Sequence, residues 1–388
     1  MFPASVETGD AHAAQHDRCP IFAAKGAGAV LTDVDGNEYI DYALSDGTLL
    51  LGHADDRIVA AIGKAVAKGY ALGAPCEAET RLAELVVARL SSVDTIQWTA
   101  SAADARALAV EIARRVTGRS TAVAFEGGSA ISDATLAPYN DTQTFEERLS
   151  EAPDGVAAVV IEPVARAMGL VPADEDFFAA VARLAKAHGA LLVVDESMTA
   201  FRSGRGGAYE QYDVMPDMVC LGSSVSGGMP LGALVGRREL MDLAPSALSA
   251  SDRSRFRPDA ITLAAGVATM QATGEDGFHK GLEELAVRLE EGLRAGAAEA
   301  GVPMYLTRPG SMLGLFFRNA PVRDLPSAKK GDVSRAVRFR SEMQERGVYL
   351  GASPFIEFFV SAAHTEAIID ATVEAAHESF RLLAQAPQ

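Results

Sequence analysis

The amino-acid sequence predicts an α/β protein with a mainly parallel sheet covered by helices, followed by a smaller α+β region. In the middle of the chain, continuous apolar runs of strand length, such as Val156–Ile161 and Met218–Leu221, alternate with helical segments. Near the C-terminus the pattern changes to a long helix, short strands and a final helix. The 388 residues suit one large domain with a smaller partner.

The first elements are expected to be short. Two strands, Ala29–Thr32 and Glu38–Tyr42, are joined by a tight turn at Asp33-Val-Asp-Gly-Asn37. Apolar residues at helical spacing then predict three helices, of which the last ends at a glycine. These helices span Ile58–Ala71, Glu77–Leu90 and Ala102–Thr117.

The middle of the chain supplies the predicted parallel sheet. Its expected strands are Val156–Ile161, Ala190–Val194, Met218–Leu221 and Ala233–Val235, and a helix covers Phe177–His188 before the capping Gly189. In such sheets the chemistry lies beyond the carboxyl ends of the strands. Asp195 directly follows one of these ends and is therefore a candidate site residue.

The C-terminal elements form a separate group. A helix from Gly281 to Ala300 precedes the strands Met312–Phe317 and Phe355–Ser361, and the last helix spans Thr365–Leu383. We predict a large domain at 45–275 and a small domain at 276–388. An N-terminal segment, 1–44, is expected to pack with the small domain.

Composition excludes several classes of protein. The net charge of −17 disfavours binding to nucleic acid and to anionic membranes. The N-terminus is polar, and the apolar runs are too short to span a bilayer, so a soluble cytoplasmic protein is expected. Cys19, Cys76 and Cys220 are few and far apart, which predicts free thiols and no metal site.

The segment Val194-Asp-Glu-Ser-Met-Thr-Ala-Phe-Arg202 resembles the pyridine-binding motif of class III aminotransferases, and within that family the chain is most similar to the glutamate-1-semialdehyde aminomutases. Further matches follow in order along nearly the whole chain. They are Asp33-Val-Asp-Gly-Asn-Glu-Tyr-Ile-Asp41, Leu51-Gly-His53, Gly73-Ala-Pro75, Ile161-Glu-Pro-Val164, Gly228-Met-Pro-Leu-Gly232, Gly310-Ser-Met-Leu-Gly-Leu-Phe-Phe317, Gly347-Val-Tyr-Leu350 and Ser361-Ala-Ala-His-Thr365. The resemblance implies a fold-type I homodimer with its active site at the subunit interface. It also implies PLP held as a Schiff base on a lysine, with an aspartate salt-bridged to the pyridinium nitrogen.

By this resemblance Asp195 is the family aspartate, although an ordinary strand-end acid that caps nearby amides is the alternative. The family lysine follows the next strand in a Leu-Gly-Lys motif, and the matching stretch here places Ser223 at that position. No lysine stands between Lys186 and Lys280. A serine hydroxyl forms no imine and cannot perform the proton shift of transamination. Ser223 is then either a small polar filler or a residue whose hydroxyl contacts a ligand.

The residues implied to hold the cofactor phosphate and ring are also changed. The family has Asn-Ser-Gly-Thr-Glu-Ala at a helix N-terminus, whereas this chain keeps Ser101 but has Ala102 and Ala103 next. Ser129 replaces the ring-stacking tyrosine. Arg255 lies near the position of a phosphate-binding threonine from the neighbouring subunit, where it either offsets part of the loss or belongs to a solvated loop. Each lost hydrogen bond to phosphate costs roughly 1.5–3 kcal/mol, so two lost hydroxyls weaken binding by about two to four orders of magnitude.

Three further departures concern the substrate side. Cys19-Pro-Ile-Phe22 occupies the stretch in which the family has a carboxylate-binding arginine. Only about ten residues run from Ser129 to Pro138, where the family has a long closing insertion. The stretch Ser353-Pro-Phe-Ile356 lacks the glutamate of the family motif.

These substitutions predict a repurposed scaffold that cannot form the lysine–PLP aldimine. The first hypothesis is PLP-independent action, or weakened non-covalent use of PLP or PMP, on a small polar amino or oxo metabolite in biosynthesis. Asp195 then serves as acid or base, and Ser223, Ser101 and Arg255 contact the ligand. The second hypothesis is a non-catalytic subunit that pairs with an active aminotransferase as a heterodimer, or that regulates one; otherwise a homodimer is expected. The third is residual transaminase or aminomutase activity by an unusual mechanism.

Overall fold

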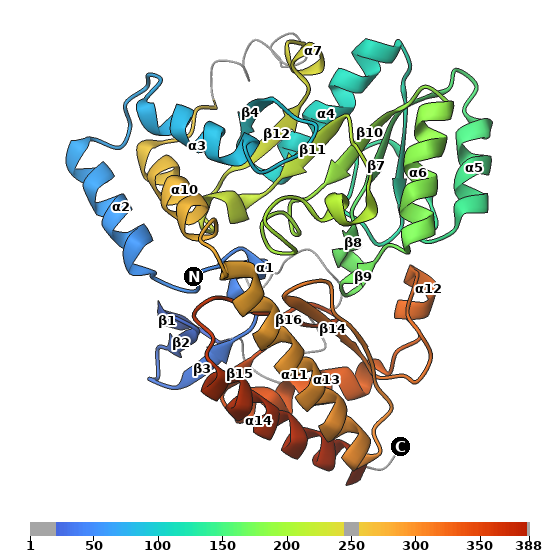
Figure 1. The fold of residues 1–388 in the computed structure, drawn as a ribbon. Helices are drawn as coiled ribbons and strands as arrows, with labels where there is room; N and C mark the ends of the chain where they lie inside the picture. Colours follow the sequence, from blue (N-terminus) through green and yellow to red (C-terminus); the bar gives the residue numbers. More distant parts are fainter. Residues whose placement is uncertain (1–20, 244–255, 386–388) are drawn as a thin grey trace, which may run out of the picture.

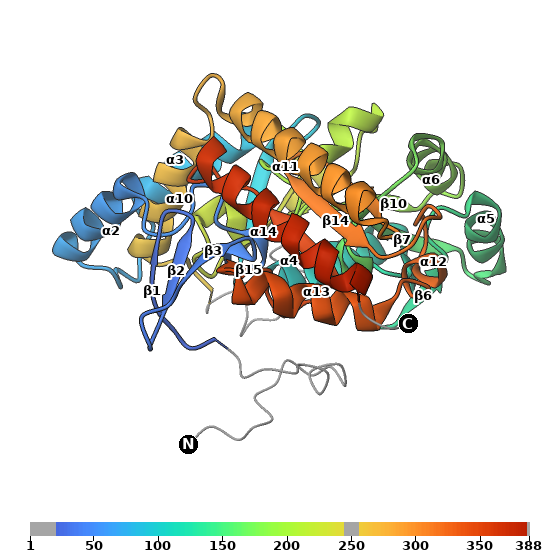
Figure 2. The same ribbon diagram turned by 90° about the horizontal axis from the view of Figure 1, so that it is seen from below.

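The computed structural model describes residues 21–243 and 256–385. Figure 1 shows a large sheet with helices on both faces in the upper part of the molecule, and smaller sheets covered by helices α11, α13 and α14 in the lower part. The first strands, β1 to β3, also lie in the lower part, beside the C-terminal helix α14 (Figures 1 and 2). The two ends of the described chain therefore belong to the same part of the molecule.

A seven-stranded sheet forms the large part, in the order β4-β12-β11-β10-β7-β5-β6. Its strands are β4 (Thr95–Thr99), β12 (Gly232–Gly236), β11 (Met218–Leu221), β10 (Leu191–Asp195), β7 (Val156–Ile161), β5 (Thr121–Phe125) and β6 (Ala134–Ala137). The pairs among β11, β10, β7, β5 and β6 are all parallel. The prediction of a mainly parallel sheet is therefore confirmed.

One strand departs from the predicted arrangement. The strand expected at Ala233–Val235 exists as β12, but it pairs antiparallel with both β11 and β4. The connection from Leu221 to Gly232 is short, and a parallel crossover needs about a dozen residues or more. The chain therefore turns back beside β11 instead of crossing over the sheet.

The strands of the large sheet divide their side chains between two apolar layers. Val159 and Ile161 of β7 belong to one buried cluster, and Ala158 and Val160 belong to another. Because successive side chains of a strand point to opposite faces, the sheet is covered on both sides. Helix α4 (Ala102–Thr117) packs on β7, β10, β11 and β12 from one side.

The remaining helices of the large part agree with the predicted helices to within a few residues at each end, where both exist. Predicted helices Ile58–Ala71, Glu77–Leu90 and Phe177–His188 correspond to α2, α3 and α6. The helices are α1 (Leu44–Gly47), α2 (Asp56–Lys68), α3 (Glu77–Val87), α5 (Thr142–Glu151), α6 (Glu175–Ala187), α7 (Arg238–Met241) and α10 (Ala260–Ala272), with 3-10 turns η2 (Arg166–Met168), η3 (Ala208–Tyr212) and η4 (Ser223–Ser226). A two-stranded sheet joins β8 (Val164–Ala165) and β9 (Val171–Pro172).

The C-terminal part contains two small sheets and four helices. Its helices are α11 (Phe278–Ala300), α12 (Leu325–Ala328), α13 (Val333–Glu345) and α14 (Glu366–Gln385). One sheet joins β13 (Tyr305–Thr307), β14 (Met312–Phe316) and β16 (Ile356–Phe359). The other joins β1 (Ala23–Ala27), β2 (Val30–Asp33), β3 (Glu38–Asp41) and β15 (Val348–Tyr349), so N-terminal strands pair with a C-terminal one. The proposed boundaries at 1–44, 45–275 and 276–388 remain a prediction.

Three compositional predictions can be compared with the part of the chain that the structure describes. No helix there is long and apolar enough to cross a membrane. Within the same residues no group of three or more histidine, cysteine or acidic side chains could hold a metal ion. Cys76 and Cys220 are free thiols, whereas Cys19 lies outside the described residues. Burial raises the pKa of the Cys220 thiol, which keeps it protonated and unreactive.

Candidate functional site

The carboxyl ends of five strands meet at one edge of the large sheet. Since β12 is antiparallel to both of its neighbours, β4 runs in the same direction as β11, β10, β7 and β5. A polar residue lies at or shortly after the end of each of these strands. In the order β4, β11, β10, β7 and β5, these residues are Ser101, Ser223, Asp195, Glu162 and Ser129. The sequence-predicted residues Asp195, Ser223, Ser101 and Ser129 are therefore brought to one edge, as is general for ligand sites in α/β sheets.

Asp195 is buried, with 2% of its surface exposed, and both of its carboxylate oxygens have partners. Oδ1 accepts a hydrogen bond of 3.0 Å from the Ser197 backbone N–H. Oδ2 accepts one of 2.9 Å from Nη1 of Arg106, which forms an ion pair with it. Asp195 thus caps a nearby amide and at the same time has a resident cation on its other oxygen.

Arg106 was missed by the sequence reasoning, although a signal was present. It lies on the face of α4 that also presents Ala109, Val110 and Ala113 at helical spacing, and all three of these are buried against the sheet. A cation on a buried face requires a buried acid as partner. The Arg106 side chain is 13% exposed, so the pair with Asp195 is largely shielded from solvent.

Glu162 was also missed as a site residue, although it follows the buried strand β7 as directly as Asp195 ends β10. Oε1 accepts a hydrogen bond of 2.5 Å from the Ser129 N–H, and Oε2 accepts one of 3.1 Å from the Arg166 N–H. Burial raises the pKa of Glu162 to about 7, and the charge of Asp195 acts in the same direction. Glu162 therefore ties two loops together and titrates near neutral pH.

The residues predicted to bind phosphate form the first turn of α4. Ser101 is the N-cap, and its Oγ accepts the Asp104 N–H at 3.2 Å and donates to the Asp104 carboxylate at 2.7 Å. Ala102 and Ala103 follow it, and neither offers a hydroxyl. The serine hydroxyl thus stabilises its own helix, which is the ordinary role of an N-cap serine.

Ser223 begins the turn η4 and is half-buried. Its carbonyl oxygen accepts the Ser226 hydroxyl at 2.9 Å and the Gly228 N–H at 2.9 Å. The Ser223 hydroxyl forms no hydrogen bond with another residue of the described chain. Arg255, the last predicted contact, lies outside the described residues.

The space beside Asp195 is small. A cavity of about 10 Å³ is lined by Arg106, Ser129, Glu162 and Asp195, among others, and is called the Asp195 cavity below. That volume holds about one water molecule.

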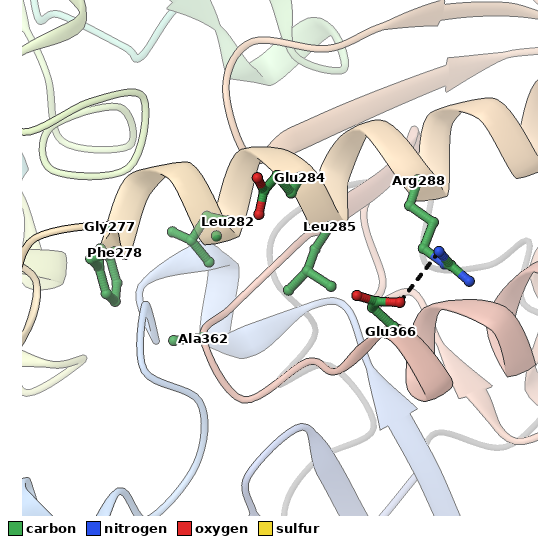
Figure 3. A pocket seen from close by; sticks show the side chains of 9 residues that line it. Gly277, Phe278, Leu282, Glu284, Leu285, Arg288, Ala362 and Glu366 are labelled. Carbon is green, nitrogen blue, oxygen red and sulfur yellow. Dashed lines mark ion pairs between the residues drawn. The ribbon is translucent and has the colours of Figure 1, made fainter.

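Another hollow, of about 660 Å³, lies between the start of α11 and the start of α14 (Figure 3). In Figure 3 Arg288 and Glu366 form an ion pair at this hollow, with a nitrogen–oxygen distance of 3.5 Å. Glu284, which also lines it, pairs with Lys280 at 3.6 Å. Arg288 also contacts Asp370. The charged groups at this hollow thus satisfy one another, and none of its lining residues belongs to the Asp195 cavity.

The fold is that of the fold-type I, PLP-dependent aminotransferases. The model of the family described as "Aminotransferase class-III" matches residues 11–130 and 129–380. The chain is 40% identical to the glutamate-1-semialdehyde 2,1-aminomutase of Roseiflexus castenholzii, over 95% of this chain and 91% of that protein. It is 38% identical to the enzyme of the same name from Desulfitobacterium hafniense strain DCB-2, over 94% of this chain and 92% of that protein. The chain therefore belongs to the class III aminotransferase family.

Solved structures show the same fold. An omega-transaminase from Sphaerobacter thermophilus superposes with a TM-score of 0.87 at 26% identity, covering 95% of this chain and 92% of that chain. A β-phenylalanine aminotransferase from Variovorax paradoxus gives a TM-score of 0.85 at 30% identity, covering 94% of this chain and 87% of that chain. The fold-class prediction is confirmed, and so is the likeness to the aminomutases.

Proposed function

We propose that this class III aminotransferase relative acts without the lysine–PLP aldimine, on a small amino or oxo metabolite. The proposal combines a sequence observation with a structural one. Ser223 follows β11 where the family motif has its lysine, and the sequence has no lysine between Lys186 and Lys280. The structural observation that carries the proposal is the buried ion pair between Arg106 and Asp195.

The residues present do not fit PLP. The carboxylate that would meet the pyridinium nitrogen already binds the Arg106 guanidinium at 2.9 Å. The N-cap hydroxyl of Ser101 is already bonded to Asp104, so it is not free for a phosphate.

The chain's own groups support proton transfer in place of imine chemistry. Glu162 has a pKa of about 7, so it holds or releases a proton at neutral pH, and it lies beside Ser129 and Asp195 on the lining of one cavity. Asp195 is already paired with Arg106 at 2.9 Å. We therefore propose Glu162 as the acid or base, with Asp195 as the partner of Arg106.

A second candidate function is that of a partner subunit, and one surface favours association. Helix α2 has no buried residue, and Val59 and Val66 on it are exposed, as are Tyr70 and Leu72 just after it. Exposed apolar groups of this kind mark interaction surfaces. In Figure 1 α2 lies at the outer edge of the molecule. We propose self-association through this surface, with pairing to an active aminotransferase as the alternative.

Two measurements on the purified chain test these proposals. Added PLP or PMP should give no aldimine absorption and no rise in melting temperature. A new absorption band with a rise in melting temperature would overturn the PLP-independent function. Light scattering after size exclusion should show a homodimer that Val59→Glu converts to monomer. A monomer in the unmodified chain would favour an obligatory different partner.

A further inference from the structure

A second cavity adjoins the site and is larger than the Asp195 cavity. It has a volume of about 540 Å³ and lies between the loop after β5 and the C-terminal elements β14, α12 and α13. Gly128 lines both cavities. We call the larger one the Phe355 cavity. Its volume is in the range of about 300–1,000 Å³ that small-molecule sites occupy.

The wall of the Phe355 cavity is mainly apolar. Phe316 and Phe355 form an aromatic corner with their ring centroids 5.9 Å apart. Leu325 and Val333 continue the apolar wall, and 49% of Val333 is exposed although it begins helix α13. An apolar wall left open to solvent near polar groups is typical of a ligand site.

Lys329 supplies a cation at the same cavity. It is exposed, and it forms no ion pair within residues 21–243 and 256–385. The acid beside it, Asp332, is already engaged, since it caps the Arg335 N–H at 2.9 Å and lies 3.7 Å from the Arg335 guanidinium. Lys329 and Lys330 are the only adjacent lysines in a sequence with a net charge of −17. A local positive charge therefore stands out at this cavity.

The segment that carries Lys329 is held in place by the large part of the molecule. The Arg323 carbonyl accepts a hydrogen bond of 2.7 Å from the Asn140 side chain, and the Arg323 guanidinium pairs with Asp174. Asp324 caps α12 in a reciprocal pair with Ser327. The backbone of the segment before Lys329 is therefore anchored to the large part of the molecule.

We propose that the Phe355 cavity binds a carboxylic acid with an apolar, aromatic-sized body. The body packs on Phe316 and Phe355, the carboxylate pairs with Lys329, and Gly128 leads from this cavity toward Glu162. A phosphate ligand is disfavoured because the cavity offers it a single lysine and no arginine that could bind it through two N–H groups. The inference rests on the proposed function in one respect, because it names the metabolite as an amino or oxo acid with an apolar side chain.

Binding of a model acid to the full chain tests this inference. By calorimetry, 4-phenylbutanoate should bind saturably at one site. The corresponding alcohol, 4-phenylbutan-1-ol, should bind about fivefold more weakly, and 4-phenylbutylamine more weakly still. An exposed ion pair is worth up to about fivefold in affinity, and high salt should reduce it. Equal affinity for the acid and the amine, or no saturable binding of the acid, would overturn the proposal.

Variants on two sides of the cavity locate the binding. Lys329→Met should weaken the acid about fivefold and leave the alcohol unchanged, whereas Lys330→Met, at a lysine that does not line the cavity, should change neither by more than about twofold. Val333→Asp adds an acid to the first turn of α13, where it suits the helix, and should weaken the acid about tenfold. Equal effects of Lys329→Met and Lys330→Met would contradict the site.

Two controls separate this inference from its alternatives. If the acid dissociates a dimer in light scattering, a second copy of the chain is the occupant, and the small-molecule proposal falls. If the acid binds as expected while PLP gives an aldimine band, the proposed function fails and the acid site stands. If PLP gives no band and the acid does not bind, the acid site falls and the proposed function stands.

Discussion

The Asp195 cavity and the Phe355 cavity share Gly128 but differ in nearly every other respect. The first is about 10 Å³, and its charged groups, Arg106 and Asp195, satisfy each other. The second is about 540 Å³, mainly apolar, and has one cation without an ion-pair partner in the described chain. The small cavity is lined by Asp195, which we propose to match the family aspartate, and the larger one lies beside it.

The contrast lies in how the charged groups are satisfied. A buried carboxylate needs a cation, and in this chain the Arg106 guanidinium meets that need. An apolar wall has no such requirement and can remain open to an external ligand.

Arg106→Ala should have the largest effect, because it leaves Asp195 buried and unpaired. We expect a loss of about 3–5 kcal/mol in the free energy of unfolding, measured with urea. Arg115→Ala on the same helix breaks an exposed pair with Glu111, 2.8 Å apart, and should cost less than about 1 kcal/mol. Similar losses in the two variants would show that Arg106 does not neutralise Asp195.

Gly127→Ala should have the next largest effect. Gly127 has a φ of +78°, and a Cβ there would lie 2.5 Å from Sδ of Met168, so both the backbone and Met168 must shift. We expect a loss of about 2–4 kcal/mol in the free energy of unfolding. Gly73→Ala, with a φ of +65° and no atom within 4 Å of the added Cβ, measures the backbone cost alone. If Gly127→Ala loses no more free energy of unfolding than Gly73→Ala, the residues around Gly127 at the Phe355 cavity adjust to the added methyl group without strain.

Glu162→Gln should change the pH dependence of stability. The folded carboxyl has a pKa of about 7 against 4.5 for the free side chain, so the folded chain holds more protons between these values. The free energy of unfolding therefore falls as the pH rises from 5 to 7.5. Glutamine does not titrate, so between pH 5 and 7.5 the free energy of unfolding of the variant should fall by about 1–3 kcal/mol less than that of the unmodified chain. Urea unfolding at both pH values measures this difference.

Two other buried acids limit that effect. Burial raises the pKa of Glu196 and of Glu357 to about 7 as well, so part of the fall with pH should remain in the Glu162 variant. Glu196→Gln, at an acid that is bonded to Tyr209 and Thr199 and does not line the Asp195 cavity, should remove a further part of the fall, and its effect should add to that of Glu162→Gln. An unchanged pH profile in Glu162→Gln would remove the titrating role proposed for Glu162.

Ser223→Ala should have the smallest effect. The Ser223 hydroxyl has no hydrogen-bond partner in the described chain, and the turn is held through the Ser223 carbonyl. We expect a change within about 0.5 kcal/mol in the free energy of unfolding. Loss of metabolite binding in this variant, with stability unchanged, would instead support the predicted contact of Ser223 with a ligand.

The fold could be predicted from the sequence where local patterns determine it. The bounds of β7 (Val156–Ile161) and β11 (Met218–Leu221) match the prediction, because strands buried on both faces are continuous apolar runs. The orientation of β12 was not predicted, because it depends on the length of the connection. Strands β4 and β5 were missed, since Thr95–Thr99 and Thr121–Phe125 are short and mix polar with apolar residues.

The site could be predicted only in part. The strand-end rule singled out Asp195, and the resemblance singled out Ser223, Ser101 and Ser129, but neither predicted the ion pair of Asp195 with Arg106. Arg106 and Asp195 are 89 residues apart, and no local pattern joins them. The two cavities depend on how side chains pack, which the order of residues alone does not reveal. The role predicted for Arg255 falls outside the described residues and stays a prediction.

The central claim is that Arg106, and not only the absence of a lysine, closes the ancestral cofactor site. The most direct test is the absorption spectrum of Ser223→Lys with one equivalent of PLP, compared with the unmodified chain to account for surface lysines. The account predicts no additional aldimine band in Ser223→Lys and its appearance only when Arg106→Ala is added. A stoichiometric band in Ser223→Lys alone would contradict it.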